Sequence, residues 1–499
     1  MRPLEIAVCA GNLLEFCVFA FGRRAKPWMF FLAAIAMLMG GIQALVEGPR
    51  WQMIPAYTLA VLFLAAWLAQ NFVAADNRLR KRLATRSAKG FGIGAGLVGL
   101  AVSVGLPLFL PVFQFPTPSG AYQIGTISYD WVDASRQELF STDMKARREL
   151  MGQVWYPVRG DQSSARAAYV EDAGALSAAL GRDFHMPGFT FDHFKYVATH
   201  AIPAAPVAGD QPKYAVLIFL TGLTGFRQSN TFQVEELVSH GYIVVGIDQP
   251  YAAGMVVFQD GRQIMGLTRD QMQPLIQQSL SPSEPAPMFN GQPLANGIMP
   301  YLAQDVRFTI DQLTALNKAD PKGILTGRLD LGHIGTFGIS LGAMVAAEAC
   351  HLDSRLQACL MMDAAMPADV VQSGLRQPSL WMTRPAEDMR LERQKSGGWT
   401  EADIAQTLGS MRALFNEEPA GDGYYVQMPG MFHVNFTDAP YFSPFTHELG
   451  FAGPINIQRG FDIINAYSLA FFDRHLKGRA PGLLDGPSKE FPEVIFEKR

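Results

Sequence analysis

The sequence predicts an α/β protein with a mostly parallel central sheet and helices on both faces, preceded by an α-helical, apolar N-terminal region. Short runs rich in Val and Ile, such as Val216–Leu220 and Ile243–Ile247, lack the alternation of a half-exposed strand and fit buried parallel strands. Helix-prone segments separate these runs, as crossover connections require. The apolar excess of the composition is instead concentrated before residue 115, which predicts a separate region.

Apolar runs in this first region approach or exceed the ~20 residues that span a bilayer. The four runs are Ile6–Gly22, Trp28–Val46, Tyr57–Val73 and Phe91–Phe113. The first is the weakest candidate because it is short and contains Asn12 and Glu15. A signal peptide alone does not explain four such runs. We therefore expect residues 1–118 to form a transmembrane region of about four helices.

The charges between these runs predict an orientation. Two connections are basic and contain Arg23, Arg24, Lys26, Arg78, Arg80, Lys81, Arg82, Arg86 and Lys89. The connection between the second and third runs contains only Glu47 and Arg50. By the positive-inside rule the two basic connections are cytoplasmic. The sequence thus predicts a multi-pass protein of the cell inner membrane, with residues 119–499 on the extracytoplasmic (periplasmic) side.

Residues 119–499 read as one domain of alternating strands and helices. The further predicted elements are leading strands at Thr126–Val132 and Gly152–Pro157, crossover helices at Phe232–Ser239 and Ala303–Leu316, a strand at Leu380–Thr383 and a closing helix at Ile464–Leu476. Two insertions, Ala252–Pro300 and Ala386–Ala420, do not fit this rhythm. Both are rich in Met, which suits either an adaptable apolar pocket or ordinary loop packing.

The segment Gly338–Gly342 has the pattern Gly-x-Ser-x-Gly. A β-prone stretch, His333–Phe337, precedes it, and a helix-prone stretch, Leu341–Cys350, follows it. This is the context of a nucleophile elbow, in which glycines permit a sharp turn and the serine hydroxyl lies next to the first amides of a helix. The pattern predicts Ser340 as a nucleophile.

An acid and then a histidine follow, in the order that such an elbow requires. The apolar run Ala358–Asp363 ends in a carboxylate, and a Pro-Gly turn after the predicted strand Tyr424–Gln427 leads to His433. Asp388 follows the next strand and is an alternative acid. The rival histidines are His351 and His447, and neither follows a strand and a turn.

Several segments together resemble a known family. They are Gly338–Gly342, Met362–Pro367, His433–Asp438, Val216–Arg227, Ser239–Asp248, Arg148–Leu150 and Val154–Pro157. They are similar to motifs of the platelet-activating-factor acetylhydrolases, in the plasma and type II branch of the α/β-hydrolases, as a bacterial membrane-anchored member. The resemblance covers roughly residues 119–499 and implies the α/β-hydrolase fold. It also favours Asp363 as the acid.

The resemblance implies hydrolysis of the short sn-2 acyl ester of glycerophospholipids. It also implies that the Leu223 amide joins that of Leu341 in an oxyanion hole. Thr221 stands where the family usually has His, and Ile339 and Leu341 flank the serine instead of His and Phe. These departures affect substrate preference more than chemistry. Two alternatives stay open: a general short-chain esterase or polyester hydrolase, and a catalytically inactive membrane receptor or accessory protein.

Composition and residue spacing limit the classes of ligand and cofactor that we expect. Net charge is −4, and no basic patch outside the membrane connections suggests nucleic acid. No Cys or His spacing suggests a metal site, and the serine mechanism requires no cofactor, so the expected ligand is a lipid or a small ester. Cys9 and Cys17 lie in the first apolar run. Whether Cys350 and Cys359 are bridged is left open by the sequence.

Overall fold

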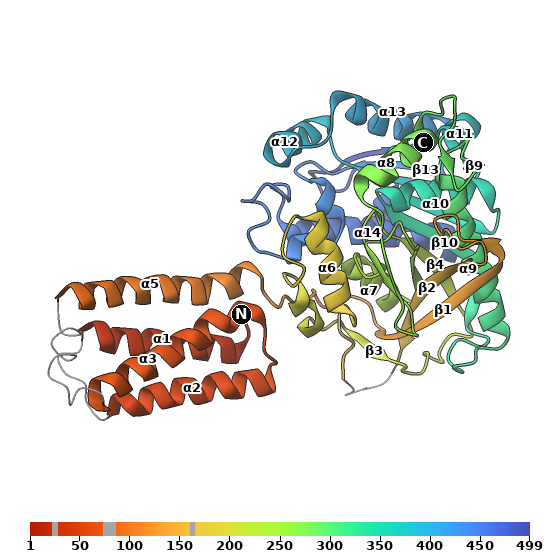
Figure 1. Cartoon of the computed structure of the whole chain (residues 1–499). Coiled ribbons are helices and arrows are strands. Elements are labelled where there is room, and N and C mark those ends of the chain that lie inside the picture. The colour runs from red at the N-terminus through yellow and green to blue at the C-terminus, as the bar shows by residue number, and fades with distance from the viewer. Residues whose placement is uncertain (22–27, 73–85, 160–164) are drawn as a thin grey trace. The chain divides into compact units, whose positions relative to one another are not determined.

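The computed structural model describes residues 1–21, 28–72, 86–159 and 165–499 (Figure 1). The chain forms two compact units. The first comprises Met1–Phe113 with two short later segments, Asp192–Val197 and Phe442–Phe445, and the second comprises the remaining residues. The predicted division at residue 118 lies close to the end of the first stretch, whereas the two later segments were not predicted.

In the described part of the first unit the long elements are four α-helices, coloured red and orange in Figure 1. They are α1 (Pro3–Phe21), α2 (Trp28–Val46), α3 (Ile54–Phe72) and α5 (Arg86–Phe109). Within the described residues, Pro3–Phe21, Trp51–Leu68 and Gly90–Phe109 are long and apolar enough to cross a membrane, whereas Phe30–Val46 is shorter. The run that looked weakest in the sequence therefore reaches spanning length, because its helix begins at Pro3.

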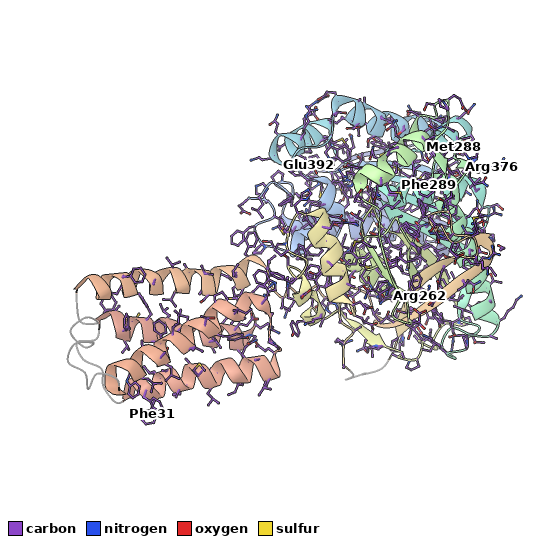
Figure 2. The ribbon with its side chains drawn as sticks, in the orientation of Figure 1. Phe31, Arg262, Met288, Phe289, Arg376 and Glu392 are labelled. Atoms are coloured by element: carbon purple, nitrogen blue, oxygen red, sulfur yellow. A yellow bond between two sulfur atoms is a disulfide. The ribbon has the colours of Figure 1, made fainter. Side chains whose placement is uncertain are left out.

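Apolar side chains lie on the outside of this bundle. Phe31, labelled in Figure 2, is 63% exposed, and Leu45 is 88% exposed. Small residues lie inside, where Ala33, Ala36 and Ala56 are buried. This arrangement, with small residues inside and large apolar residues outside, is typical of helices packed in lipid.

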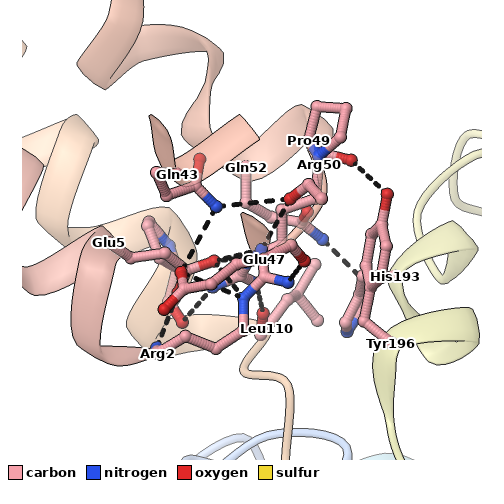
Figure 3. Close-up of polar contacts among 12 residues, drawn as sticks. Arg2, Glu5, Gln43, Glu47, Pro49, Arg50, Gln52, Leu110, His193 and Tyr196 are labelled. Carbon is pink, nitrogen blue, oxygen red and sulfur yellow. Dashed lines mark hydrogen bonds and ion pairs between the residues drawn. The ribbon is translucent and has the colours of Figure 1, made fainter. Parts of the chain in front are cut away.

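Buried charges close one end of the bundle (Figure 3). Arg50 makes two hydrogen bonds to Glu5, of 2.6 and 2.8 Å, and also donates to the Leu110 carbonyl. Arg2 contacts the same Glu5 and the carbonyls of Glu47 and Gly48. These bonds join α1, the connection between α2 and α3, and the end of α5. The predicted basic connections, apart from Arg86 and Lys89 at the start of α5, lie outside the described residues.

A ten-stranded sheet organises the second unit, in the order β14-β13-β12-β11-β10-β4-β5-β2-β1-β3. The six central strands are parallel: β4 (Tyr214–Leu220), β5 (Tyr242–Asp248), β10 (Leu329–Ile339), β11 (Leu356–Met362), β12 (Ser379–Thr383) and β13 (Gly423–Gln427). At the edges, β2 (Arg147–Val158) pairs antiparallel with β5 and with β1 (Gln123–Gln137), and β14 (Ile495–Lys498) pairs antiparallel with β13. The short β3 (Ala201–Pro203) pairs with β1.

Helices cover both faces of this sheet. The helix α9 (Met299–Lys318) packs on α10 (Leu341–Leu352), and α7 (Thr231–Ser239) packs on α14 (Ile457–Lys477). The predicted strands and crossover helices are present. The closing helix α14 begins earlier than predicted, at Ile457, where the Asn456 side chain caps it. This is the α/β-hydrolase fold.

The two insertions fold into ordered elements. The first contains the hairpin of β6 (Met255–Val257) and β7 (Gln263–Met265), α8 (Arg269–Leu280), and the hairpin of β8 (Met288–Phe289) and β9 (Gln292–Pro293). The second forms α12 (Ala386–Ser396) and α13 (Glu401–Glu417). Capping boxes at Thr268 and Thr400 start α8 and α13. Of the Met side chains, Met272, Met299, Met389 and Met411 are fully buried, so most serve ordinary packing.

A disulfide links Cys350 and Cys359, which answers a question that the sequence left open. It joins the end of α10 to β11, and both cysteines are buried. In the first unit Cys9 and Cys17 are free.

Candidate active site

The predicted site residues gather at the carboxyl edge of the parallel strands. Strands β4 and β10 are neighbours although β5 follows β4 in the chain. The order of strands therefore reverses between β4 and β10, and ligands of open α/β sheets bind at such a point. The segment after β4 contains Leu223, and the segment after β10 contains Ser340.

Ser340 has a strained backbone, with φ 57° and ψ −124°. Its two flanking glycines make this turn possible. A Cβ on Gly338 would lie 2.3 Å from the Gly342 carbonyl oxygen, and a Cβ on Gly342 would lie 2.0 Å from the Leu220 carbonyl oxygen. The Ser340 amide donates to the Met362 carbonyl at 3.0 Å, which ties the turn to β11. These contacts define the geometry of a nucleophile elbow.

The loop after β4 lies directly against this serine. A Cβ on Gly222 would be 3.2 Å from the Ser340 Cβ. The Leu341 amide is the first of α10, and within the described chain neither it nor the Leu223 amide donates an intramolecular hydrogen bond. Two unused amides beside a serine are suited to stabilising an oxyanion.

Thr221, which stands where the resembled family has His, binds the Ser229 hydroxyl at 2.8 Å. This hydrogen bond joins the two ends of the loop after β4. In the same loop, Thr224 has φ 59°, and its amide donates a hydrogen bond to the Ala252 carbonyl at 2.9 Å. The first insertion thus supports the backbone next to Leu223.

Asp363 and His433 are in direct contact. The Asp363 Oδ2 lies 2.7 Å from the His433 Nδ1. Burial raises the pKa of Asp363. The Arg384 guanidinium, His433 and the Thr383 hydroxyl lower it by more, so that the net pKa falls to about 2. Asp363 is consequently an anion at neutral pH. An anionic oxygen at Nδ1 orients an imidazole so that Nε2 can act as a base.

The rival acid Asp388 lies in α12 and accepts a hydrogen bond from the Gly430 amide at 2.9 Å. Burial raises its pKa. It is bonded to the turn before His433 and not to the imidazole. The rival histidines are also engaged elsewhere: His351 with the Ser373 hydroxyl and His447 with the Ala452 carbonyl.

Among the described residues no direct hydrogen bond joins the Ser340 hydroxyl to His433. Hydrogen bonds between a nucleophile and its base are often long in the absence of substrate and shorten in the complex. The structure thus brings together Asp363 with His433, and Ser340 with the amides of Leu223 and Leu341.

Three further residues surround His433 and were missed by the sequence analysis. Arg384 binds Asp363, Glu392 accepts the His433 amide at 3.2 Å, and the Trp399 ring lies edge to face with the imidazole at 5.3 Å between centroids. Glu392 is labelled in Figure 2. Arg384 directly follows β12, so its position at a strand end was the available signal. Glu392 and Trp399 lie in the second insertion, whose fold the sequence did not predict.

No family model matches the chain. A probable 1-alkyl-2-acetylglycerophosphocholine esterase of Arthroderma benhamiae is 24% identical over 423 residues, which are 80% of this chain and 97% of that protein. A platelet-activating factor acetylhydrolase of Cavia porcellus is 22% identical over 286 residues, 53% of this chain and 58% of that protein. The ferulic acid esterase structure from Streptomyces cinnamoneus covers 78% of this chain with a TM-score of 0.59 and 26% identity.

The chain's homologues are esterases. The predicted resemblance to the platelet-activating-factor acetylhydrolases is therefore confirmed, at modest identity. The predicted fold is confirmed as well, because the ferulic acid esterase aligns over all of its own length. The roles of Ser340, Asp363 and His433 stay predictions that rest on the geometry above.

Proposed function

We propose that this protein is a membrane-anchored serine hydrolase of carboxylic esters, with Ser340 as nucleophile, His433 as base and Asp363 as the residue that orients the base. The observation that carries the proposal is the anionic Asp363 bonded to Nδ1 of His433 at the sheet edge where the Ser340 elbow lies. The esterase homologues support the same reaction class.

In this mechanism Ser340 attacks the ester carbonyl while His433 takes its proton. The negative charge that develops on the carbonyl oxygen is stabilised by the amides of Leu223 and Leu341. His433 then gives the proton to the departing alcohol, and the carbonyl carbon stays bonded to Ser340 as an acyl-enzyme. Asp363 stabilises the imidazolium throughout. Water, activated by His433, releases the acid and restores the serine.

The proposed substrate class is the short sn-2 acyl ester of glycerophospholipids. Two relatives that are named for this activity support the proposed substrate class. Anchoring supports it too, since a domain held near a bilayer meets lipids at high local concentration. The outward-facing apolar side chains of the bundle, such as Phe31, support the anchor, as do the three helices of spanning length found among the described residues.

The disulfide between Cys350 and Cys359 supports an extracytoplasmic hydrolase domain. Disulfides form and persist in oxidising compartments such as the bacterial periplasm and are rare in the cytosol. This agrees with the orientation that the basic connections predict, and we propose the cell inner membrane with the hydrolase on its outer side.

A general esterase is the second candidate. The structural relative is named a ferulic acid esterase, and Thr221 replaces the His of the resembled family at the oxyanion loop. An inactive accessory protein is the third possibility, and the geometry at His433 argues against it.

The test is made on the detergent-solubilised full-length protein. A fluorophosphonate should label the wild type and not Ser340→Ala, and kcat/KM in micelles should be higher for sn-2 acetyl than for sn-2 palmitoyl phosphatidylcholine. Cleavage of 4-nitrophenyl acetate and butyrate without cleavage of either lipid would favour the general esterase. Labelling that survives in Ser340→Ala would place the nucleophile elsewhere, and no labelling of the wild type would favour the inactive protein.

A further inference from the structure

The guanidinium of Arg384 lies between two buried carboxylates beside the proposed base. Its Nε donates to Asp363 Oδ2 at 2.9 Å, and its Nη1 donates to Glu392 Oε2. Glu392 Oε2 in turn accepts the His433 amide at 3.2 Å, and His433 Nδ1 returns to Asp363 Oδ2. The four residues therefore form a closed ring, which we call the Arg384 ring.

The ring draws on four separate parts of the fold. Asp363 follows β11, Arg384 follows β12, Glu392 lies in α12 and His433 follows β13. Arg384 is fully buried, and Glu392 is 7% exposed. This closed set of hydrogen bonds fixes both the backbone amide and the imidazole of His433.

The loop between α12 and α13 covers this ring. The Arg384 guanidinium carbon lies 4.6 Å from the centroid of the Trp399 ring, and the same indole contacts His433. Trp399 has φ 50°, which is costly for a residue other than glycine, whereas the positive φ of Gly397 and Gly398 before it has no such cost. Asp363 and Arg384 are fully buried, which makes their charges interact more strongly.

Charge explains why Glu392 matters. During the reaction the negative charge of Asp363 stabilises the His433 imidazolium. The buried Arg384 guanidinium, bound to Asp363, offsets that negative charge. Glu392 supplies a second negative charge, so that Asp363, Arg384 and Glu392 together carry a net charge of −1. Removing Glu392 would leave Arg384 and Asp363 as a neutral pair beside the base.

We infer that Arg384 and Glu392 are positioning residues of the hydrolase reaction: Arg384 holds the acid and Glu392 restores the negative charge that the base requires. This inference rests on the proposed function of Ser340, Asp363 and His433. It extends the proposed site by two residues that touch neither the substrate nor the reacting atoms.

Other charged and titratable groups lie near His433. Besides Asp363, Arg384 and Glu392, the described groups close to the ring include Asp388 and Tyr425. Arg393 donates to the Trp399 carbonyl at 3.0 Å and is paired with Glu401. Asp388 is held by the Gly430 amide, and the phenol of Tyr425, whose pKa burial raises to about 12, is neutral. Arg384 and Glu392 are thus the pair whose removal changes the charge beside the base in opposite directions.

The experiment compares the pH dependence of kcat/KM for 4-nitrophenyl acetate, and of the rate of fluorophosphonate labelling, in the full-length protein. Glu392→Gln removes a negative charge, so the acidic limb should move to lower pH by roughly 0.5–1 unit, and kcat/KM at its plateau should fall about tenfold or more. Arg384→Met removes a positive charge, so its acidic limb should move to higher pH. The double variant should return the limb toward the wild-type position.

Arg412, Glu497 and Tyr425 provide a matched control. Arg412 pairs with Glu497 at 2.7 Å and stacks on Tyr425 at 4.0 Å, but it does not bind Asp363. Glu497→Gln should leave the acidic limb in place. Arg384→Lys, which retains the positive charge, should keep the limb near the wild-type position even if kcat falls.

The inference would be overturned if the acidic limbs of Glu392→Gln and Arg384→Met moved in the same direction, or if Glu392→Gln had the wild-type pH profile. Wild-type activity would still support the proposed function in either case. If Arg384→Met does not fold, Glu392→Gln alone decides, since a merely structural Glu392 would lower the plateau without moving the limb. If the wild type neither cleaves the ester nor labels at Ser340, the proposed function fails and the inference fails with it.

Discussion

Asp363 accepts hydrogen bonds from Thr383, Arg384 and His433, whereas Asp388 accepts one from the Gly430 amide. Both residues follow buried strands, and from the sequence alone both were within reach of the base. Three donors around a fully buried carboxylate keep Asp363 ionised and fix its direction. The single bond to Asp388 instead fixes the turn that precedes His433.

The first prediction compares these two aspartates. Asp363→Asn should lower kcat by about four orders of magnitude, because an amide at this place favours the wrong imidazole tautomer. Asp388→Asn should lower kcat less than tenfold, since an amide oxygen can still accept from Gly430. The measurement is kcat for 4-nitrophenyl butyrate with both variants at equal purity. A larger loss in Asp388→Asn would reverse the assignment.

At the scale of elements, the strand–turn–helix unit formed by β10 and α10 depends on the absence of a side chain at Gly342. A Cβ there would meet the backbone of β4, which cannot move without disturbing the sheet. The same unit is joined to β11 by the disulfide. The elbow is thus held on both sides by neighbouring strands.

The second prediction concerns this glycine. Gly342→Ala should lower the free energy of unfolding by more than about 3 kcal/mol, as expected for a clash with buried backbone, or prevent folding. The control is Gly409→Ala in the middle of α13, where nothing lies within 4 Å of the added Cβ. That change should be neutral or stabilising by about 0.5–1 kcal/mol. Equal effects of the two substitutions would contradict the geometry described for the elbow.

The segment after His433 is joined to the start of α7 through Asp438. Its amide donates to the Ser229 carbonyl at 2.8 Å, and its carboxyl accepts from the amides of Thr231 and Phe232 and from the Tyr169 hydroxyl. Burial raises the pKa of Asp438 to about 7, although these donors act in the other direction. The proposed base loop is therefore connected to the loop after β4 by a carboxyl that titrates near neutral pH.

The third prediction follows from that pKa. An unfolded Asp ionises near pH 3.9, so between about pH 4 and pH 7 the folded state retains a proton that the unfolded state has lost. Stability contributed by the protonated group is complete below pH 4 and declines as pH rises to 7. In the Asp438→Asn variant the amide at this position does not ionise. The wild type should therefore lose up to roughly 4 kcal/mol relative to this variant between pH 4 and pH 7.5. Unfolding free energies of both proteins at several pH values measure this loss, and a difference that is constant with pH would contradict it.

The elements that sequence analysis predicted are those with a strong local signal. Buried runs such as Val216–Leu220 and the elbow at Ser340 have unambiguous patterns, and the structure has strands and a turn at those places. The edge strand β14 and the helices α12 and α13 were missed, because their positions depend on tertiary contacts. For the same reason Arg384 was recognisable only as a residue after a strand, and its link to Glu392 required the fold.

At the scale of the whole molecule, the bundle and the hydrolase unit differ in the kind of surface that they show. The bundle has large apolar side chains outside, whereas the hydrolase unit buries its apolar residues around the sheet. This contrast supports two different surroundings for the two units, lipid for the first and water for the second.

The fourth prediction is the side of the membrane on which the hydrolase unit lies. Protease added to intact spheroplasts should digest residues 119–499 and leave a small membrane fragment, as the basic connections require. Peptide mapping after alkylation without reductant should find Cys350 linked to Cys359, and Cys9 and Cys17 alkylated. Full protection from protease together with four alkylated cysteines would place the unit in the cytoplasm.

The first unit is not continuous in the sequence, and this affects how the protein can be divided. Phe194 and Phe442, which come from the later segments of that unit, pack against Phe113 with ring centroids 5.8 and 5.9 Å apart, and Phe445 stacks on Phe109 at 6.0 Å. A truncated protein that begins at residue 119 would keep these three rings and lose Phe109 and Phe113, although Phe194 and Phe442 would still contact each other at 4.7 Å between centroids. An enzyme prepared without its anchor would therefore expose apolar rings in two internal segments and would be prone to self-association.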